Sequence, residues 1–370
     1  MNLLMISGDR SLSQGKRGAF WYTLDVLREH FDRIDIICPR VSSASSATEP
    51  FSNVFLHPSP WPLLFQSRWI VRKGKELIRE HHHQTMTVHE FPPFYNGWGA
   101  WRLSRKTKIP YALEIHHIVG FPEAASFAEG IGYALSLLFL PFDARRATTV
   151  RTVNATVRDV LSRWGIPRHK IQIVPSLYID TTIWKPDPFA DKKFDLVCCG
   201  RMVENKGLIE LLEALAEIPT ASLLLIGDGP LRKELERHVQ QLGLSSRVTF
   251  AGWMPSQEDV ARAVRSARVF VMNSRSEGGP RVVAEAMAAG MPVIATNVGV
   301  VPDIINNREN GMVVPMERLE LVGAIRALLA DPSLQQKIGI EAAKIGERFE
   351  RRKRIGVYAE FLQSLSSSRA

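Results

Sequence analysis

The sequence has few cysteines and lacks a hydrophobic run long enough to cross a membrane. Its 370 residues include three cysteines, and because Cys198 and Cys199 are adjacent, no CxxC pair exists for a zinc site or a disulfide framework. This usage favours a reducing compartment. The longest apolar run covers residues 131–142, whereas a membrane-spanning helix needs roughly 20 residues. We expect the first residues, MNLLMISGDR, to form a β-strand and not a signal peptide, since no cationic leader precedes them.

The usual phosphate-binding and metal-binding motifs are also missing. A Walker sequence ending in Gly15-Lys16 would need glycine at position 10, where Arg10 stands. The stretch GDGPLR, residues 227–232, lacks the third glycine of a dinucleotide fingerprint, so we interpret it as a tight structural turn. No DxD motif occurs, and the HHH tract at 81–83 is a poor chelator because consecutive side chains diverge. We therefore expect no cofactor and no metal.

Positive charge is concentrated in the first half of the chain. The net charge is +9, and residues 1–184 contribute +7 of it, from 22 Lys and Arg against 15 Asp and Glu. Residues 60–75, PWPLLFQSRWIVRKGK, combine aromatic side chains at helical spacing with four cations. This pattern fits either an anionic membrane surface or acidic acceptor, or a core-packed helix with a solvated basic side. No nucleic-acid-binding motif accompanies the charge, so nucleic acid is not an expected partner.

Short β-branched runs alternate with amphipathic helical stretches throughout the chain. This alternation predicts an α/β protein with parallel sheets built from βαβ units. Residues 185–193, KPDPFADKK, interrupt the series and form the best domain boundary, so we expect two Rossmann-like domains. The expected strands are NLLMIS, RIDIIC, MTVH, YALEIHH, TTVRTV and IQIVPS in the first half, and FDLVCCG, SLLLIGDG, RVTFAG, RVFVMNS, PVIATNV and GMVVP in the second.

The stretch SEGGPRVVAEAMAAG, residues 276–290, predicts an anion site. Gly278 and Gly279 clear side chains from a turn, and Pro280 starts a helix whose first N–H groups can bind an anion. Glu277 and Glu285 would repel a phosphate, but they suit hydroxyl groups on either side of one, as in a nucleotide sugar. Taken singly, Glu285 could be an exposed helix carboxylate and Glu277 a partner of the helix dipole.

A second loop adds positive charge. The stretch GRMVENKG, residues 200–207, follows the strand DLVCC and places Arg201 and Lys206 between a strand and a helix. Both cations could neutralise a leaving diphosphate. The alternative is an ordinary solvated pair of loop side chains.

These motifs, in this order and spacing, resemble the donor half of the retaining GT-B glycosyltransferases of family GT4. The similarity covers GRMVENKG, LLIGDGP, RVTFAG, EGGPRVVAE, EAMAAGMPVIATNVG, PDII and GMVVP, and extends more loosely to YALEIHH and VPSLYIDTTIWKP in the first half. It implies two Rossmann-like domains that face each other across a cleft. The expected boundaries are an acceptor-side domain at 1–184, a donor-binding domain at 185–352 and, at 353–370, a C-terminal helix that crosses back to the first domain.

The resemblance also implies roles for single residues. Arg201 and Lys206 would bind the donor diphosphate and stabilise its departure, Glu285 would hold the ribose, and Glu277 would hold the transferred sugar. His116 matches a family histidine close to sugar and phosphate. The expected catalytic residues are thus Arg201, Lys206, Glu277 and His116, and the expected substrate-binding residues are Glu285, Gly278, Gly279, Arg281 and Gly18.

The implied reaction is transfer of a sugar with retention of anomeric configuration, from a UDP-, GDP- or ADP-sugar to a hydroxyl acceptor. No nucleophilic carboxylate pair is recognisable, so a front-face attack assisted by the leaving phosphate fits better. We expect the acceptor to be a lipid-linked or cell-surface glycan, and the protein to be cytoplasmic, peripheral on the inner membrane face. The alternatives are an epimerase or phosphorylase of the same fold and a non-catalytic scaffold that binds nucleotide sugar.

Overall fold

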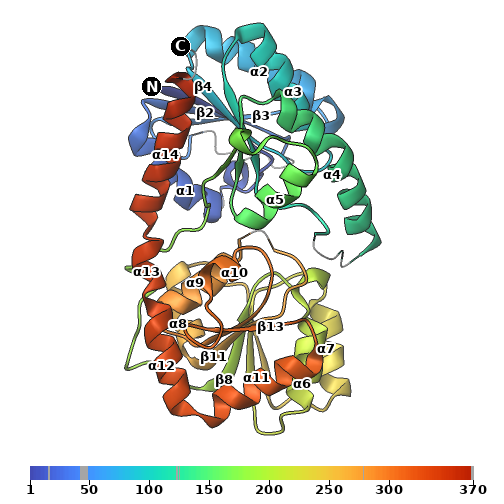
Figure 1. The fold of residues 1–370 in the computed structure, drawn as a ribbon, viewed down its shortest axis with the longest axis vertical. Helices are drawn as coiled ribbons and strands as arrows, with labels where there is room; N and C mark the ends of the chain where they lie inside the picture. Colours follow the sequence, from blue (N-terminus) through green and yellow to red (C-terminus); the bar gives the residue numbers. More distant parts are fainter. Residues whose placement is uncertain (16, 42–48, 122–123, 125, 278, 368–370) are drawn as a thin grey trace. The chain divides into compact units, whose positions relative to one another are not determined.

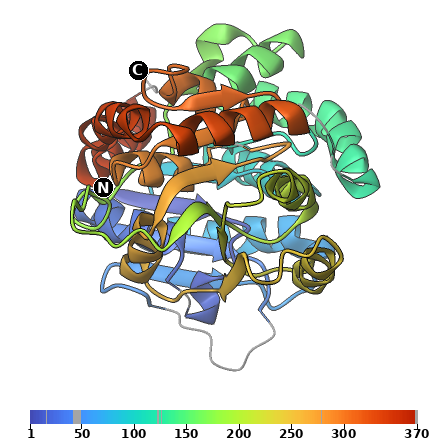
Figure 2. The same ribbon diagram turned by 90° about the horizontal axis from the view of Figure 1, so that it is seen from below.

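The computed structural model describes residues 1–370 except 16, 42–48, 122–123, 125, 278 and 368–370. It divides into two compact units, each an α/β structure with one parallel sheet between layers of helices (Figure 1; Figure 2). The prediction of two Rossmann-like domains with parallel sheets is confirmed. The first unit comprises Met1–Ile118, Ile131–Ser176 and Arg352–Ala370, and the second comprises Val119–Gly130 and Leu177–Arg351.

The first unit contains a seven-stranded sheet in the order β3-β2-β1-β4-β5-β6-β7. The sequence patterns identify six of these strands and miss β3, an edge strand that pairs only with β2 and buries few of its side chains. A strand with one partner and one half-exposed face carries a weak hydrophobic signal. The strands are β1 (Asn2–Ile6), β2 (Arg33–Cys38), β3 (Val54–Pro58), β4 (Thr85–His89), β5 (Tyr111–Ile115), β6 (Thr149–Thr152) and β7 (Ile171–Ile173).

The last helix of the chain, α14, packs on the first unit and lies beside α1 (Figure 1). Arg352 pairs with Glu29 at 2.9 Å, and the Gln363 side chain donates to the His30 carbonyl at 2.9 Å. The apolar face of α14, including Ile355 and Leu362, is buried. The helices associated with this sheet are α1 (Ala19–Leu27), α2 (Gln66–His81), α3 (Tyr95–Thr107), α4 (Phe127–Arg146), α5 (Ala155–Arg163) and α14 (Arg351–Ser367).

The second unit contains a six-stranded parallel sheet in the order β10-β9-β8-β11-β12-β13. All six strands expected in this half are present: β8 (Phe194–Cys199), β9 (Leu223–Ile226), β10 (Val248–Gly252), β11 (Ala267–Met272), β12 (Val293–Thr296) and β13 (Met312–Val314). The helices are α6 (Leu208–Ala216), α7 (Arg232–Gln241), α8 (Gln257–Arg265), α9 (Arg281–Ala288), α10 (Val301–Ile304), α11 (Arg318–Ala330), α12 (Pro332–Ala343) and α13 (Ile345–Arg348).

Strand alternation divides the interior of the second unit into two cores. Val197 and Phe270 belong to the core formed with α8, α9 and α13, while Leu196 and Val269 belong to the core formed with α6, α7 and α11. Successive side chains of a strand point to opposite faces, so each strand supplies both cores. The adjacent Cys198 and Cys199 are therefore separated by the sheet, both are free thiols, and burial raises the pKa of each to about 12.

The GDGPLR stretch forms a turn that packs against the loop after β8. Gly227 adopts φ +122, and a Cβ added there would lie 2.0 Å from the Gly200 carbonyl oxygen. Only glycine fits such a position, because both its backbone conformation and the contact exclude a side chain. The glycines thus bring two strand-to-helix loops into contact.

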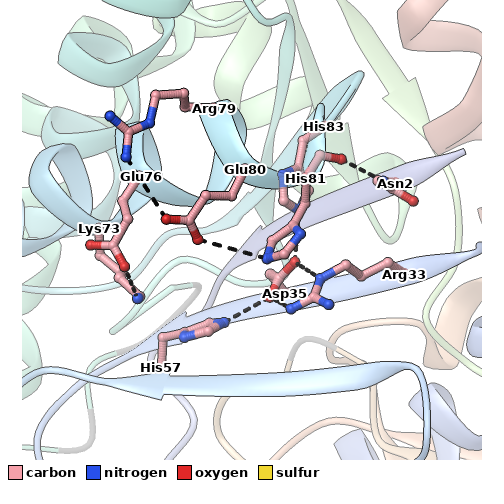
Figure 3. Close-up of polar contacts among 10 residues, drawn as sticks. All are labelled: Asn2, Arg33, Asp35, His57, Lys73, Glu76, Arg79, Glu80, His81 and His83. Atoms are coloured by element: carbon pink, nitrogen blue, oxygen red, sulfur yellow. Dashed lines mark hydrogen bonds and ion pairs between the residues drawn. The ribbon is translucent and has the colours of Figure 1, made fainter.

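A buried ionic cluster around Asp35 on β2 lies within the first unit (Figure 3). The Asp35 side chain is fully buried and accepts from Arg33 at 2.6 Å, from His57 at 2.7 Å and from His83 at 2.8 Å. Burial by itself raises the pKa of Asp35, but these three partners outweigh it and lower the pKa far below its usual value. Within the HHH tract, His83 is therefore bound to Asp35.

Replacing Asp35 should destabilise the first unit strongly. Asp35→Asn leaves Arg33 without its carboxylate partner, and losing one member of a buried ionic cluster costs about 3 to 5 kcal/mol. The lowered pKa means that the charged form stabilises the fold above the unfolded-state aspartate pKa of about 3.9. The difference from the parent should thus shrink as the pH falls below about 4, as measured by urea unfolding.

Asp32→Asn is the matched control. The Asp32 side chain is 82% exposed and pairs with the N-terminal amine, so its loss should cost no more than about 1 kcal/mol. Equal effects of the two substitutions would contradict the stabilising role of the Asp35 cluster.

Candidate functional site

In the second unit the strand order reverses between β8 and β11, which are adjacent in the sheet. Ligands in open parallel sheets bind at the carboxyl ends of the strands where this reversal occurs. The loops that follow these two strands contain GRMVENKG and SEGGP. A pocket at this edge is lined from both loops, and its wall includes Arg201, Lys206, Asn273 and Ser274. The fold therefore joins the two motifs that the sequence analysis selected separately.

The two loops are tied together by polar contacts. Lys206 forms an ion pair with Glu277, and the Ser274 hydroxyl donates to the same carboxylate at 3.0 Å. The Asn205 side chain donates to the Ser276 carbonyl at 3.1 Å. Lys206 and Glu277 thus bind each other in this structure, and each has a charged group that can bind a ligand instead. Arg201 is exposed on the pocket wall.

Helix α9 begins at Arg281, directly after Pro280, and no side chain caps its N-terminus. The Val283 N–H donates to the Pro280 carbonyl, so the N–H groups of Arg281 and Val282 and the positive end of the dipole are the groups available to an anion.

Gly279 is exposed, and a Cβ placed there would meet no atom within 4 Å. The Arg281 guanidinium lies 4.0 Å from the ring centre of Tyr178, so this side chain is held by an aromatic neighbour. Gly278 lies outside the described residues.

Glu285 lies in the second turn of α9 and is half-buried. Burial raises the pKa of its carboxyl to about 7, and Arg281 opposes part of this shift. An acid with this pKa is partly protonated at neutral pH, so Glu285 can either donate to or accept from a hydroxyl group. Strongly shifted acids of this kind are typical of functional sites.

In the first unit, His116 belongs to a charged cluster centred on Glu114. Glu114 lies on β5, opposite His89 of β4 and Arg151 of β6 in the strand register. Its side chain is fully buried and accepts from His116 at 3.0 Å, from Arg151 and from Tyr358 of α14. Burial by itself raises the pKa of Glu114, but Arg151 and the histidines outweigh it and the pKa falls well below the usual range.

The His116 ring is 41% exposed, so one side of the Glu114 cluster is open to solvent. Burial lowers the pKa of His116, and the hydrogen bond to Glu114 opposes this shift. The His89 and His116 rings lie 5.3 Å apart. The arrangement fixes the orientation of a neutral imidazole, which can then exchange hydrogen bonds with a ligand. His117 is exposed.

His89, Glu114 and His116 could together hold a metal ion by the proximity of their ligand atoms. Arg151 argues against this use, because its guanidinium already neutralises Glu114 in the same buried space. A divalent cation would have to displace Arg151 or lie beside it, and the repulsion between two buried positive groups is large.

Gly18 precedes the first residue of α1, and no side chain caps this helix either. The strand order of the first sheet reverses between β1 and β4, so the loop that carries Gly18 follows a strand at that reversal. Gly18 therefore lies in the loop after β1 and His116 directly after β5, two parallel strands of one unit that are separated in the sheet by β4.

Four residues of the Glu114 cluster were not selected from the sequence: His89, Glu114, Arg151 and Tyr358. One signal was available for His89, since it ends the strand MTVH as His116 follows the strand YALEI. For Arg151 and Tyr358 no local signal exists, because each reaches Glu114 only through the strand pairing or the docking of α14.

Comparisons with known proteins find a family match for each unit. Residues 180–345 match the family described as Glycosyl transferases group 1, and residues 23–176 match the Glycosyl transferase 4-like domain. The two matches cover most of both units. The second unit therefore matches the group 1 glycosyltransferases and the first matches the glycosyl transferase 4-like domain, which is consistent with the resemblance seen in the sequence.

One relative is the lipopolysaccharide core biosynthesis glycosyltransferase LpsE of Rhizobium meliloti. It is 38% identical over 140 residues, which are 38% of this chain and 40% of that protein. The match thus spans about two fifths of the relative's length.

Solved structures with the same fold include a sucrose-phosphate synthase from Thermosynechococcus elongatus, with a TM-score of 0.87, 22% identity and full coverage of both chains. Another is Anabaena HepE in complex with UDP and glucose, with a TM-score of 0.75 and 21% identity, covering 98% of this chain and 100% of that chain. These likenesses confirm the GT-B type of fold.

The raised pKa of Glu285 predicts a pH effect on stability. The folded state keeps this proton up to a pH of about 7, whereas the unfolded state releases it near 4.3. The free energy of unfolding should therefore fall as the pH rises from about 4.3 to about 7. Glu285→Gln should gain stability relative to the parent over that range in urea unfolding, and Glu320→Gln, at an exposed position, should not. A constant difference between Glu285→Gln and the parent at all pH values would contradict the assigned pKa.

The Tyr358 hydroxyl should contribute measurably to the first unit. Tyr358→Phe removes a buried hydrogen bond to a carboxylate, a change that costs roughly 1.5 to 3 kcal/mol. Denaturant unfolding gives the value, and Tyr133→Phe, at a half-buried tyrosine of α4, is the matched control with little expected change. If both variants had the same free energy of unfolding as the parent, the hydrogen bond from Tyr358 to Glu114 would not stabilise the packing of α14.

Proposed function

We propose that the protein transfers a sugar from a nucleotide-diphosphate sugar to a hydroxyl acceptor, with retention of anomeric configuration. The observation that carries this proposal is the convergence of Lys206, Glu277, Glu285 and the uncapped N-terminus of α9 at one strand-order reversal. The match of the second unit to the group 1 glycosyltransferases supports it, as does the binding of UDP and glucose by Anabaena HepE.

In this proposal each group has one task. Arg201, Lys206 and the first N–H groups of α9 bind the diphosphate, and Gly279 leaves room for it to approach the backbone. Glu285 binds the ribose hydroxyls and Glu277 binds hydroxyls of the transferred sugar. Because Glu277 holds Lys206 when no donor is bound, the ammonium group stays near the diphosphate position instead of extending into solvent.

The proposed chemical step breaks the bond between the anomeric carbon and the phosphate oxygen, and the electron pair leaves with the diphosphate. The acceptor oxygen forms the new bond on the same face of the sugar, and its proton passes to the departing phosphate. Lys206 and Arg201 stabilise the negative charge that develops on the leaving group. The roles proposed for His116 and Gly18 are contacts to the sugar and phosphate groups. The step as proposed requires no metal or cofactor.

The proposed acceptor is a lipid-linked or cell-surface glycan. The excess of positive charge in the first half of the chain and the similarity to a lipopolysaccharide core glycosyltransferase support this choice. An enzyme with such an acceptor would work in the cytoplasm, on the inner face of the membrane.

Calorimetric titration with UDP, GDP, ADP and their sugars tests the donor site. We expect one nucleotide family to bind, and Lys206→Ala to weaken that binding by about 10-fold to 100-fold, because a charge-assisted hydrogen bond contributes roughly 1.5 to 3 kcal/mol. Glu285→Ala should weaken the binding of nucleotides that carry ribose by a similar factor. The exposed positions Lys233→Ala and Glu320→Ala are matched controls and should bind as the parent does.

The titration and a turnover assay together separate the alternatives. Binding without turnover on any hydroxyl acceptor would favour a scaffold, and conversion of the donor alone would indicate an epimerase. A parent protein that binds none of the three nucleotide families would contradict the proposed donor site.

A further inference from the structure

Helix α4 is the described helix that is long and apolar enough to cross a membrane by length and composition. The expectation that no segment reaches this length was wrong, because it counted only residues 131–142 and the helix continues at both ends. It has 20 residues, and no charged residue stands between Glu129 and Asp143. One side of it belongs to the fold, however, because Ser136, Leu140 and Asp143 are buried. A helix packed along one side on its own domain can lie on a bilayer, but it cannot span one without leaving the domain.

The other side of α4 exposes large apolar side chains. Ile131 is 47% exposed and Leu138 is 67% exposed, and their spacing of seven residues places them on one face of the helix. Leu137 and Phe139 are also exposed beside them. Contiguous exposed apolar surface of this kind is uncommon on a soluble protein unless it binds something.

Aromatic rings and arginines border this apolar stripe. Trp98 of α3 stacks on Phe142 of α4 with ring centres 5.4 Å apart, and it lies 5.0 Å from Trp101. The Arg146 guanidinium is centred 3.3 Å from the Phe142 ring, and that of Arg105 lies 5.2 Å from the Trp101 ring. Tryptophans that carry stacked cations next to exposed aliphatic side chains are typical of the level of lipid headgroups.

The exposed charge around the stripe is predominantly positive. Six cations on α3, in the turn after it and at the end of α4 are exposed, and none of them makes an ion pair within the part of the chain that the structure describes. Among the described acids of the same stretch, Glu114 and Asp143 are buried, and Glu129 in the first turn of α4 is half-buried. The six cations are Arg102, Arg105, Lys106, Lys108, Arg145 and Arg146.

We propose that this α3–α4 surface, formed by Trp98, Arg102, Arg105, Ile131, Leu138 and Arg146, docks the protein onto an anionic lipid bilayer. Helix α4 lies in the plane of the interface with Ile131 and Leu138 in the acyl boundary, and the arginines contact lipid phosphates. Each cation near an anionic bilayer contributes a few-fold to binding, and aliphatic insertion adds to it.

Charge complementarity favours a bilayer over a second copy of the chain. A second copy would bring the same six cations toward their own equivalents, and like charges across an interface disfavour association. Residues 60–75, which the sequence analysis connected with a membrane, expose Leu64 and Phe65, but Trp61 and Trp69 are half-buried there. The exposed apolar stripe therefore identifies α4 as the inserting element.

Vesicle co-sedimentation of the full chain tests the docking surface without requiring catalysis. We expect binding to vesicles of phosphatidylcholine and phosphatidylglycerol in equal amounts, weak binding to phosphatidylcholine alone, and loss of the difference at high salt. Leu138→Glu should weaken binding at least tenfold, and Arg105→Glu combined with Arg146→Glu should weaken it at least about 20-fold, since one cation contributes about fivefold.

Two matched controls and a fold check accompany the variants. Leu319→Glu changes a leucine that is 76% exposed on α11 of the other unit, Lys233→Glu reverses an exposed charge on α7, and both should bind like the parent. Unchanged thermal unfolding of the variants shows that they remain folded.

Several outcomes would overturn the proposal: no preference for anionic vesicles, equal binding of Leu138→Glu and the parent, or a self-associating parent that Leu138→Glu turns into a monomer. Nucleotide binding is measured separately by titration. A protein that binds vesicles but no nucleotide would contradict the proposed function and support the docking surface. A protein that binds a nucleotide but no vesicles would contradict the docking surface and support the proposed donor site.

Discussion

The arrangement of parallel strands is the constraint on which the candidate site depends. Parallel strands end at the same edge of a sheet, and the loops separate where the strand order reverses. In the second unit this point falls between β8 and β11, and the loops after these strands supply Lys206 and Glu277. Two residues 71 positions apart in sequence thus form an ion pair. Helix α9 follows the second loop and adds its free N-terminus and Glu285 to the same edge.

The two buried carboxylates of the first unit show how such a sheet accommodates charge. Asp35 and Glu114 each contact one arginine and two histidines, and in both cases these partners outweigh the cost of burial and lower the carboxyl pKa. Their surroundings differ in exposure. In the Asp35 cluster His83 is fully buried and His57 is mostly buried, whereas the Glu114 cluster reaches solvent through His116. The first therefore stabilises the sheet, and the second also presents an oriented imidazole at a strand end.

Much of the fold and part of the candidate site could be predicted from the sequence because their signals are local. Eleven residues from Glu277 to Met287 contain a turn, a helix start and two acids, and periodicity alone identifies the six strands of the second unit. The edge strand β3 was missed because its partly exposed face gives little hydrophobic pattern. The partnership of Arg151 and Tyr358 with Glu114 depends on strand register and on the docking of the last helix, neither of which the local sequence encodes.

A crystal structure of the protein with the nucleotide sugar that binds most tightly tests the central claim most directly. The account predicts the diphosphate at the N-terminus of α9, with Lys206 in contact with it and Glu285 hydrogen-bonded to the ribose hydroxyls. A nucleotide bound elsewhere on the second unit, or one whose phosphates contact neither Lys206 nor the first amides of α9, would contradict it.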